Sequence, residues 1–125
     1  MIQDKMFPVL EELLSWTSRR QQALAANVAN MDTPGYRAKD YSFKEEMQSL
    51  AMTATSGNHI APVEAASIAR IYEVDTPEKP NGNSVNLDRE LTEITKNGLQ
   101  YITLVQFLNH RIRTLRAAIT DGGRV

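Results

Sequence analysis

The feature that most constrains this 125-residue chain is a run of residues near its C-terminus that recurs at alternating steps of four and three. This heptad row consists of Leu87, Leu91, Ile94, Gly98, Tyr101, Val105, Leu108, Ile112, Leu115 and Ile119. Such spacing puts every member on one side of an α-helix and is typical of a coiled coil. We expect this helix to run from Val85 to Thr120, with Asn86 or Ser84 as its N-cap and Gly122-Gly123 after its end.

A second long helix is predicted at the other end of the chain, because apolar residues from Ile2 to Asn30 also recur at helical spacing. Antiparallel pairing would bring Glu11 and Glu12 toward the arginines late in the last helix, whereas parallel pairing would oppose like charges. It would also place Asn27 near the start of the last helix. The expected intrachain seam contains Leu10, Leu13, Leu24, Leu91, Ile94 and Leu115.

The predicted fold class is therefore mainly α: an antiparallel coiled-coil pair with a small irregular middle region. That middle region holds four of the five prolines. It predicts a short helix over Ser42 to Thr53, one short strand over Ala69 to Asp75, and a linker reading TPEKPNGNS. The expected boundaries are 1–31 for the N-terminal coiled-coil helix, 32–84 for the turn, middle region and linker, and 85–121 for the C-terminal coiled-coil helix, all within one structural domain.

One segment of the last helix has more apolar surface than a single partner helix covers. Its apolar residues point to all sides: Leu99, Tyr101, Ile102, Leu104, Val105, Phe107 and Leu108. A helix that is apolar all round is buried all round. The middle region could cover part of this segment, but we favour neighbouring copies or other proteins, because exposed patches of this size mark interaction sites. We therefore expect residues 99–108 to be a subunit-packing helix.

Composition and motifs argue against several function classes. Lys plus Arg number 14 and Asp plus Glu number 15, so the chain lacks the basic surface that nucleic acid or an anionic membrane requires. The chain has no cysteine, which excludes disulfides and thiolate metal sites. Neither His59 nor His110 has a partner at metal-ligand spacing, and no nucleotide-binding or hydrolase motif occurs. We expect no cofactor, no small-molecule substrate and no enzyme activity.

The stretch AANVANMDTPGYR, residues 25–37, joins the first helix to the middle region. Asn30 is a candidate C-cap, since asparagine tolerates the left-handed conformation. Pro34-Gly35 suits the centre of a type II turn, where glycine accepts a positive φ, and Thr33 before proline should be extended. Asn27 falls at a heptad position of the first helix, where a polar residue lowers stability but fixes register and partner.

The sequence around this stretch, ANVANMDTPGYRAKDYSF, resembles the N-terminal signature of the bacterial flagellar rod and hook proteins, the axial protein family. The matching positions are Asn27, Ala29, Asn30, Asp32, Thr33, Pro34, Gly35, Tyr36, Ala38, Asp40 and Phe43. The last helix also looks like the closing helix of that family. Only about 55 residues separate the two helices, which favours the small rod proteins over the larger distal rod and hook proteins.

The resemblance implies a structural subunit of the proximal rod, forming a helical tube that transmits torque and surrounds the protein-export channel. It implies as partners copies of the chain, other rod proteins, the adaptor FliE, and the export gate and membrane-embedded ring. It also implies location in the basal body, in the periplasmic space, after export by the flagellar type III apparatus. The N-terminus, which shows no cleaved signal peptide, is consistent with that route.

The resemblance further implies that the stretch acts as an assembly joint, made of Asn27, Asn30, Asp32, Thr33, Pro34, Gly35 and Tyr36. The residues alone leave a different function class open: a soluble helical adaptor or export chaperone that docks one partner through its C-terminal helix. A small enzyme using His110 is the weakest alternative, because no second catalytic group accompanies it.

Overall fold

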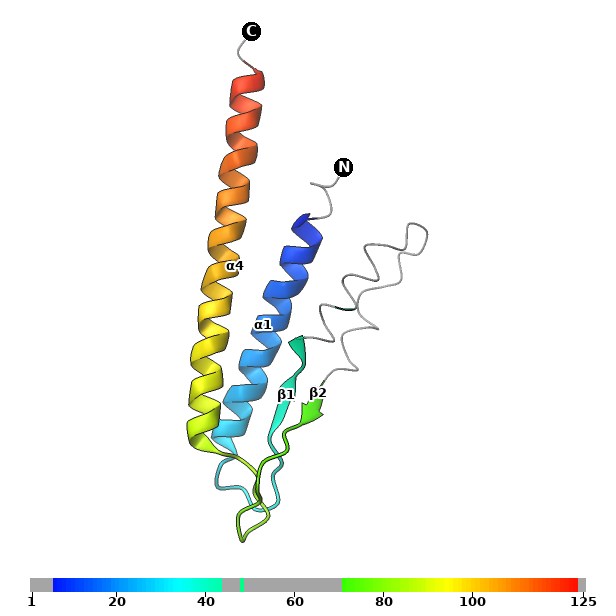
Figure 1. The fold of residues 1–125 in the computed structure, drawn as a ribbon, viewed down its shortest axis with the longest axis vertical. Coiled ribbons are helices and arrows are strands. Elements are labelled where there is room, and N and C mark those ends of the chain that lie inside the picture. The colour runs from blue at the N-terminus through cyan, green and yellow to red at the C-terminus, as the bar shows by residue number, and fades with distance from the viewer. Residues whose placement is uncertain (1–5, 44–47, 49–70, 124–125) are drawn as a thin grey trace.

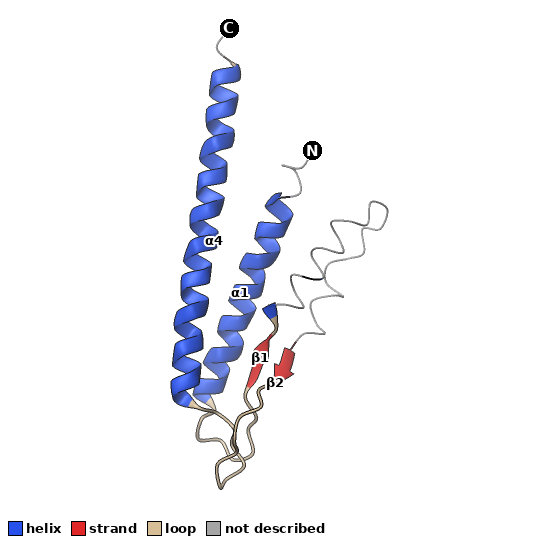
Figure 2. Ribbon diagram, viewed as in Figure 1, coloured by secondary structure: helices blue, strands red, loops and turns tan. Residues whose placement is uncertain are grey.

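The computed structural model describes residues 6–43, 48 and 71–123 and confirms the mainly α fold class. Helix α1 (Met6–Ala29) and helix α4 (Leu87–Gly122) lie side by side and run in opposite directions (Figure 1). Strands β1 (Lys39–Tyr41) and β2 (Ile71–Glu73) form a two-stranded antiparallel sheet next to α1 (Figure 2). Loops between these elements gather at one end of the helix pair (Figure 1). We call this end, residues 20–41 and 71–93, the base.

Helix α4 begins and ends two residues later than the predicted bounds, Val85 and Thr120. The Asn86 side chain accepts a hydrogen bond from the backbone N–H of Arg89 at 3.2 Å, and Asp88 and Glu90 occupy the first turn. Acidic side chains in the first turn stabilise a helix, because they interact favourably with the positive end of its dipole. At the other end, the N–H of Gly123 donates to the carbonyl of Ile119 at 3.1 Å. Asn86 is therefore the N-cap, and the helix ends at the predicted glycine pair.

The buried line on α4 lies beside the heptad row and not on it. The buried residues of α4 are Glu90 and Asn97, each one position before a member of the row. Leu91, predicted in the intrachain seam, is 50% exposed, whereas Glu90 is 1% exposed. Glu90 and Asn97 are buried because polar groups of α1 and of residues next to it form hydrogen bonds with their side chains. Among the other predicted seam residues, Leu10 and Leu24 are buried, and Leu13, Ile94 and Leu115 are half-buried.

The upper part of α4 extends past the described start of α1 (Figure 1). Helix α4 has 36 residues and α1 has 24. The expected attraction between Glu12 and the late arginines does not form an ion pair among the described residues. Glu12 instead binds Arg19 of its own helix at 3.0 Å.

The small sheet contains one expected and one unexpected strand. β2 lies within the predicted strand over Ala69 to Asp75, and it pairs with β1 in the register Lys39–Glu73, Asp40–Tyr72 and Tyr41–Ile71. β1 was not predicted, because its three residues, KDY, carry little strand preference. Next to the sheet, Ala38, Val74 and Val85 form a buried cluster that Met31 and Tyr36 cover. The predicted helix over Ser42 to Thr53 and the loop with His59 lie almost wholly outside the described residues.

Neither α1 nor α4, the helices that the described part of the chain contains, has a window long and apolar enough to span a membrane.

Candidate assembly site

The turn after α1 has the geometry that its proline and glycine predict. The backbone N–H of Tyr36 donates to the carbonyl of Thr33 at 3.2 Å, which closes a four-residue turn around Pro34 and Gly35. Gly35 has a φ of 73°, a value at which a Cβ would be strained. The predicted type II turn is therefore confirmed.

Asn30 ends α1 by a different means from the one expected. No described residue other than glycine has a positive φ, so Asn30 does not adopt the left-handed conformation. Its side-chain amide instead donates to the carbonyl of Ala26 at 2.8 Å, and its side-chain oxygen accepts from the Thr33 hydroxyl at 3.1 Å. The Ala26 carbonyl therefore accepts from both the backbone N–H and the side-chain amide of Asn30 at the end of the helix.

A second loop holds the turn from the other side, and its sequence was predicted to be only a linker. The side-chain amide of Asn83, which is fully buried, donates to the carbonyls of Asn30 and Thr33, each at 2.8 Å. Gly35 donates its N–H to the carbonyl of Asn81 at 3.0 Å. The residues PNGNS therefore clamp the turn. They were missed because two asparagines between prolines and glycines also describe a solvated loop.

Asn27 lies at the centre of the base with no exposed surface. Its amide nitrogen donates to the Lys39 carbonyl at 2.8 Å and to a carboxylate oxygen of Glu90 at 3.0 Å. Its amide oxygen accepts from the Tyr36 hydroxyl at 3.1 Å and from the Lys39 N–H at 3.0 Å. Both donors and both acceptor positions are used. Asn27 thereby fixes the turn, β1 and α4 to α1 at one level.

About two helical turns before Asn27 on α1, a buried charge cluster joins α1, β1 and α4. Arg20 binds both carboxylate oxygens of Asp40, at 2.9 and 3.1 Å, and also Glu93 at 2.5 Å. Arg89 contacts the same Asp40 at 3.3 Å and Glu90 at 2.9 Å. Asp40 and Glu90 are each 1% exposed. Because buried carboxylates are costly unless paired, these arginines define how the three elements meet.

The surroundings of the cluster shift the ionisation of its outermost acid. Partial desolvation alone would raise the pKa of Glu93, but the hydrogen bond and the charge of Arg20 outweigh it, and the net pKa lies below its ordinary value. The guanidinium of Arg20 also lies 5.7 Å from the ring centre of Trp16, within range of a cation–π contact. Glu93 therefore keeps its negative charge in mildly acidic solution.

The assembly joint divides into an inward and an outward part. Asn27 faces inward and Tyr36 is half-buried against it, so intrachain bonds account for both residues. Asp32, Thr33, Pro34 and Gly35 are exposed at the tip of the base. Residues 32–35 thus form the part of the joint that is free to meet another molecule.

The predicted subunit-packing segment of α4, residues 99–108, carries large apolar side chains at the surface. Leu99 is 61% exposed, Ile102 54%, Tyr101 47% and Phe107 44%, while Leu104, Val105 and Leu108 are half-buried. Large apolar side chains at such exposure are not covered by any described part of the chain. A run of them on one helix is the surface signature of protein–protein contact.

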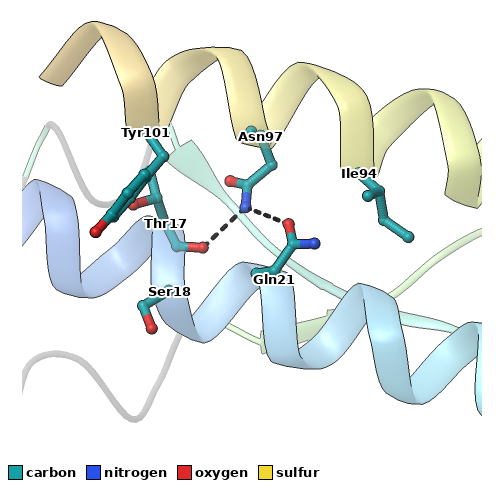
Figure 3. Close-up of a pocket in the computed structure, with 7 residues that line it drawn as sticks. Thr17, Ser18, Gln21, Ile94, Asn97 and Tyr101 are labelled. Carbon is teal, nitrogen blue, oxygen red and sulfur yellow. Dashed lines mark hydrogen bonds between the residues drawn. The ribbon is translucent and has the colours of Figure 1, made fainter. Parts of the chain in front are cut away.

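Two grooves run between α1 and α4 at the level of Thr17. The first, of about 400 Å³, is lined by Thr17, Ser18, Gln21, Ile94, Asn97, Gly98 and Tyr101 (Figure 3). In it, the Asn97 amide donates to the Thr17 carbonyl and to the Gln21 side chain, each at 2.9 Å (Figure 3). The second, of about 280 Å³, lies between Trp16, Phe43 and the segment from Leu99 to Leu104. Neither groove gathers the acid, base and nucleophile of an enzyme site.

Metal-binding chemistry has no support in the described part of the chain, where no three His, Asp or Glu side chains converge as ligands. The acids that do lie close together, Asp40, Glu90 and Glu93, are engaged by Arg20 and Arg89. What the arrangement offers instead is a base held by paired polar side chains and a side of α4 whose apolar residues are exposed.

Comparisons with known proteins agree with this arrangement. Residues 12–37, which include Arg20, Asn27 and the turn, match the family model described as flagella basal body rod protein. The chain is 34% identical to the flagellar basal body rod protein FlgB of Salmonella typhimurium, over 90% of this chain and 91% of that protein. It is 33% identical to FlgB of Escherichia coli, over 90% and 91% of the two chains, and 33% identical to FlgB of Bacillus subtilis, over 90% and 92%.

Proposed function

The chain belongs to the FlgB family of flagellar basal body rod proteins and is a structural subunit of the rod, and from this premise we propose that it builds the proximal rod. Copies of the chain and other rod proteins would pack side by side into a helical tube. That tube would transmit torque and surround the protein-export channel. The proposed role of the chain is mechanical and includes no catalytic step.

The observation that carries the proposal is the exposed apolar side of α4. Leu99 and Ile102 are more than half exposed in the single chain. Burying apolar surface contributes about 25 cal/mol per Å², so several such side chains supply a large drive toward association. In a tube, each subunit meets neighbours on more than one side, and a helix that is apolar all round finds cover there.

The proposed partners follow from the proposed place of the chain in the proximal rod. We propose that the exposed tip of the joint, residues 32–35, contacts adjacent subunits, and that FliE, the export gate and the membrane-embedded ring lie next to the proximal end of the tube. The chain would reach the basal body through the flagellar type III apparatus without cleavage of a signal peptide. These are expectations from family membership, and each predicts that the chain co-purifies with basal bodies.

The experiment that tests the proposal is a charge placed on the exposed side of α4. Leu99→Glu and Ile102→Glu together should leave the purified chain as helical and as stable as the natural one, because both positions are solvated in it. Motility should be lost, and distal rod proteins should be missing from isolated basal bodies. Leu104 is a poorer choice, because it is half-buried, whereas Leu99, which lines the same groove next to Trp16, is 61% exposed.

Gln106→Glu together with Asn109→Asp is the matched control, since the pair adds the same two charges at exposed polar positions of the same helix. It should leave motility unchanged. Normal motility in the Leu99/Ile102 variant would contradict the structural role. Recovery of the natural chain only in the soluble fraction, bound to one partner, would favour an adaptor or export chaperone instead.

A further inference from the structure

Two asparagine–glycine pairs occur in the chain, and they lie in different surroundings. Asn81-Gly82 belongs to the loop that clamps the turn after α1, whereas Asn97-Gly98 lies inside α4. An asparagine followed by glycine is especially prone to spontaneous deamidation, because glycine has no side chain to shield its backbone nitrogen or to restrict its rotation. Each pair is therefore a candidate site of chemical modification, and the surrounding fold determines whether it reacts.

The reaction converts the asparagine side chain into an acid in two steps. The backbone nitrogen of Gly82 loses its proton and attacks Cγ of Asn81, and the Cγ–Nδ2 bond breaks as ammonia leaves with that proton. The product is a cyclic imide in which the Gly82 nitrogen carries no hydrogen. Water then opens the ring at either carbonyl and leaves an aspartate or an isoaspartate at position 81. The isoaspartate adds a carbon atom to the main chain, which then runs through Cβ and Cγ.

In the folded chain, the peptide unit that must react is held at both of its polar atoms. The carbonyl of Asn81 accepts the N–H of Gly35 at 3.0 Å, and the N–H of Gly82 donates to the carbonyl of Lys79 at 2.8 Å. The ring cannot close while this second bond is made, because closure removes the Gly82 hydrogen. The carboxamide is engaged as well, since its oxygen accepts the N–H of Asn83 at 3.1 Å. The closed base therefore opposes the reaction.

The fold also requires the glycine that makes Asn81 reactive. Gly82 has a φ of 78°, at which a residue with a side chain is strained. A Cβ built on Gly82 would lie 3.4 Å from Cα of Gly35, so a side chain there would touch the backbone of the turn. The close approach of the two loops thus places a reactive pair at the point where one loop clamps the other.

Exposure distinguishes the two pairs. The side chain of Asn81 is exposed, so water reaches it whenever the loop opens. Asn97 is 2% exposed, and its amide nitrogen donates to the Thr17 carbonyl and to the Gln21 side chain, each at 2.9 Å. Gly98 lies within a helix of 36 residues, which must unfold locally before its nitrogen can react. Since loops open at a lower free energy than helix interiors, Asn81 should react before Asn97 in the folded chain.

We propose that Asn81 is a deamidation site controlled by the clamp: it is protected while the base is closed and reacts when the loop opens, and its isoaspartate product keeps the base from closing. In that product, the carbonyl that accepts from Gly35 becomes a free carboxylate. The added carbon displaces Asn83, whose amide holds the carbonyls of Asn30 and Thr33. Modification therefore turns a transient opening of the base into a permanent one.

The rate of modification is measured on the purified natural chain, so the result is independent of the proposed role in the rod. The folded chain and the chain unfolded in guanidinium chloride are incubated in the same mildly alkaline buffer. Trypsin releases residues 71–89 and 97–111 as separate peptides, because Lys79 precedes a proline and is not cleaved. Mass spectrometry follows the conversion of Asn81 and Asn97 to acids, and chromatography separates the aspartate from the isoaspartate form.

Both asparagines should react at similar rates in the unfolded chain, because each precedes a glycine. Folding should slow the reaction of Asn81 about tenfold or more, which corresponds to an opening free energy of ~1.4 kcal/mol or more. It should slow the reaction of Asn97 further. Equal rates for Asn81 in the folded and unfolded chains would overturn the proposal. So would an Asn81 that is stable in the unfolded chain, or one that reacts more slowly than Asn97 in the folded chain.

A variant of the clamp separates local opening from global unfolding. Asn83→Ala removes the amide that holds the turn and should speed the reaction of Asn81 about fivefold or more, while Asn97 stays protected. Asn109→Ala, at an exposed position of α4, is the matched control and should leave both rates unchanged. If Asn97 also loses protection, Asn83→Ser is used, because it keeps one donor. Unchanged protection of Asn81 in a clamp variant would show that the clamp does not control the site.

The effect of the product on the fold is measured on the isoaspartate chain, isolated after incubation in the unfolded state. It should unfold at a lower urea concentration than the natural chain. Asn81→Asp is the matched comparison, since it carries the acid without the added main-chain carbon. It should unfold at the natural concentration, because its exposed carboxylate can still accept the Asn83 N–H. An isoaspartate chain as stable as the natural one would contradict the proposed effect on the base.

Discussion

The base of the molecule and the upper half of α4 differ in the kind of side chain that they bury and expose. In the base, polar side chains are buried and paired: Asn27 uses every donor and acceptor that it has, and Arg20 holds Asp40 and Glu93. On α4 above the base, apolar side chains such as Leu99 and Ile102 are exposed. The polar groups of the first region are paired within the chain, whereas the apolar side chains of the second are left exposed.

This difference indicates which interactions determine the fold of the single chain and which are available for assembly. Directional hydrogen bonds and ion pairs set the register of α1, β1 and α4, because they tolerate only one arrangement. Apolar surface on α4 is less specific, because the free energy of burying apolar area is non-directional. Variants in the base should therefore act on the folding of the single chain, and variants in the upper α4 on assembly.

The largest expected effect comes from breaking the charge cluster. Arg20→Met should lower the free energy of unfolding by about 3 kcal/mol or more, because it leaves Asp40 and Glu93 with less compensation. Urea titration of the purified chain measures the loss. Arg113→Met is the matched control on exposed α4 and should change stability by less than ~0.5 kcal/mol. Equal effects of the two changes would remove the distinction between the regions.

The next effect comes from the amide at the centre of the base. Asn27→Ala should cost about 2–3 kcal/mol, because the Lys39 backbone and the Tyr36 hydroxyl lose their partner in a buried site. Thermal unfolding followed by circular dichroism measures it. Asn109→Ala, at an exposed position of α4, provides the comparison and should be nearly neutral. A neutral Asn27→Ala would show that the turn is held without it.

The turn itself should contribute less. Gly35→Ala forces a side chain onto a φ of 73° and should cost about 1 kcal/mol. Gly122→Ala, at the end of α4, is its control, since an added Cβ there meets no atom and no positive φ is involved. If both changes prove equally mild, the turn relaxes to another conformation and its strict geometry is not needed by the single chain.

The smallest effect concerns acid. The folded pKa of Glu93 lies below its unfolded value, so its ionised form stabilises the fold above about pH 4.3, and this contribution is lost as the pH falls through the folded pKa. Stability should therefore decline below about pH 4. Glu93→Gln should have a flatter profile in that range, measured by urea titrations at several pH values. Parallel profiles for the two chains would contradict the assignment to Glu93.

Much of the architecture could be predicted from the sequence. Long apolar periodicity predicted both helices, Asn86 was one of two predicted N-caps of α4, and Pro34-Gly35 predicted the turn. These signals are local, since they depend on spacing within a few turns of one helix or on the backbone preferences of two adjacent residues. The antiparallel pairing was predicted from charges, and it is observed although Glu12 pairs with Arg19 and not with the late arginines. The resemblance to the rod and hook proteins, confirmed by the FlgB relatives, supplied the function.

The face of α4 that meets α1 could not be predicted from the same pattern. The apolar row suggested Leu91, but Glu90 is buried there because its carboxylate is bound by Asn27 and Arg89. Likewise, Asn83 clamps the turn from more than 45 positions away in the sequence. Such bonds depend on which residues far apart in the sequence meet in the fold, and apolar periodicity does not predict those contacts. The predicted role of residues 99–108 in subunit packing remains a proposal.

The central claim is that the exposed side of α4 is solvent-facing in the single chain and covered in the rod. The most direct measurement is the rate at which a maleimide modifies Ile102→Cys, the sole thiol of an otherwise cysteine-free chain. The account predicts rapid modification in the purified chain and in denatured basal bodies, and strong protection in intact basal bodies. Equally rapid modification in intact basal bodies would contradict it.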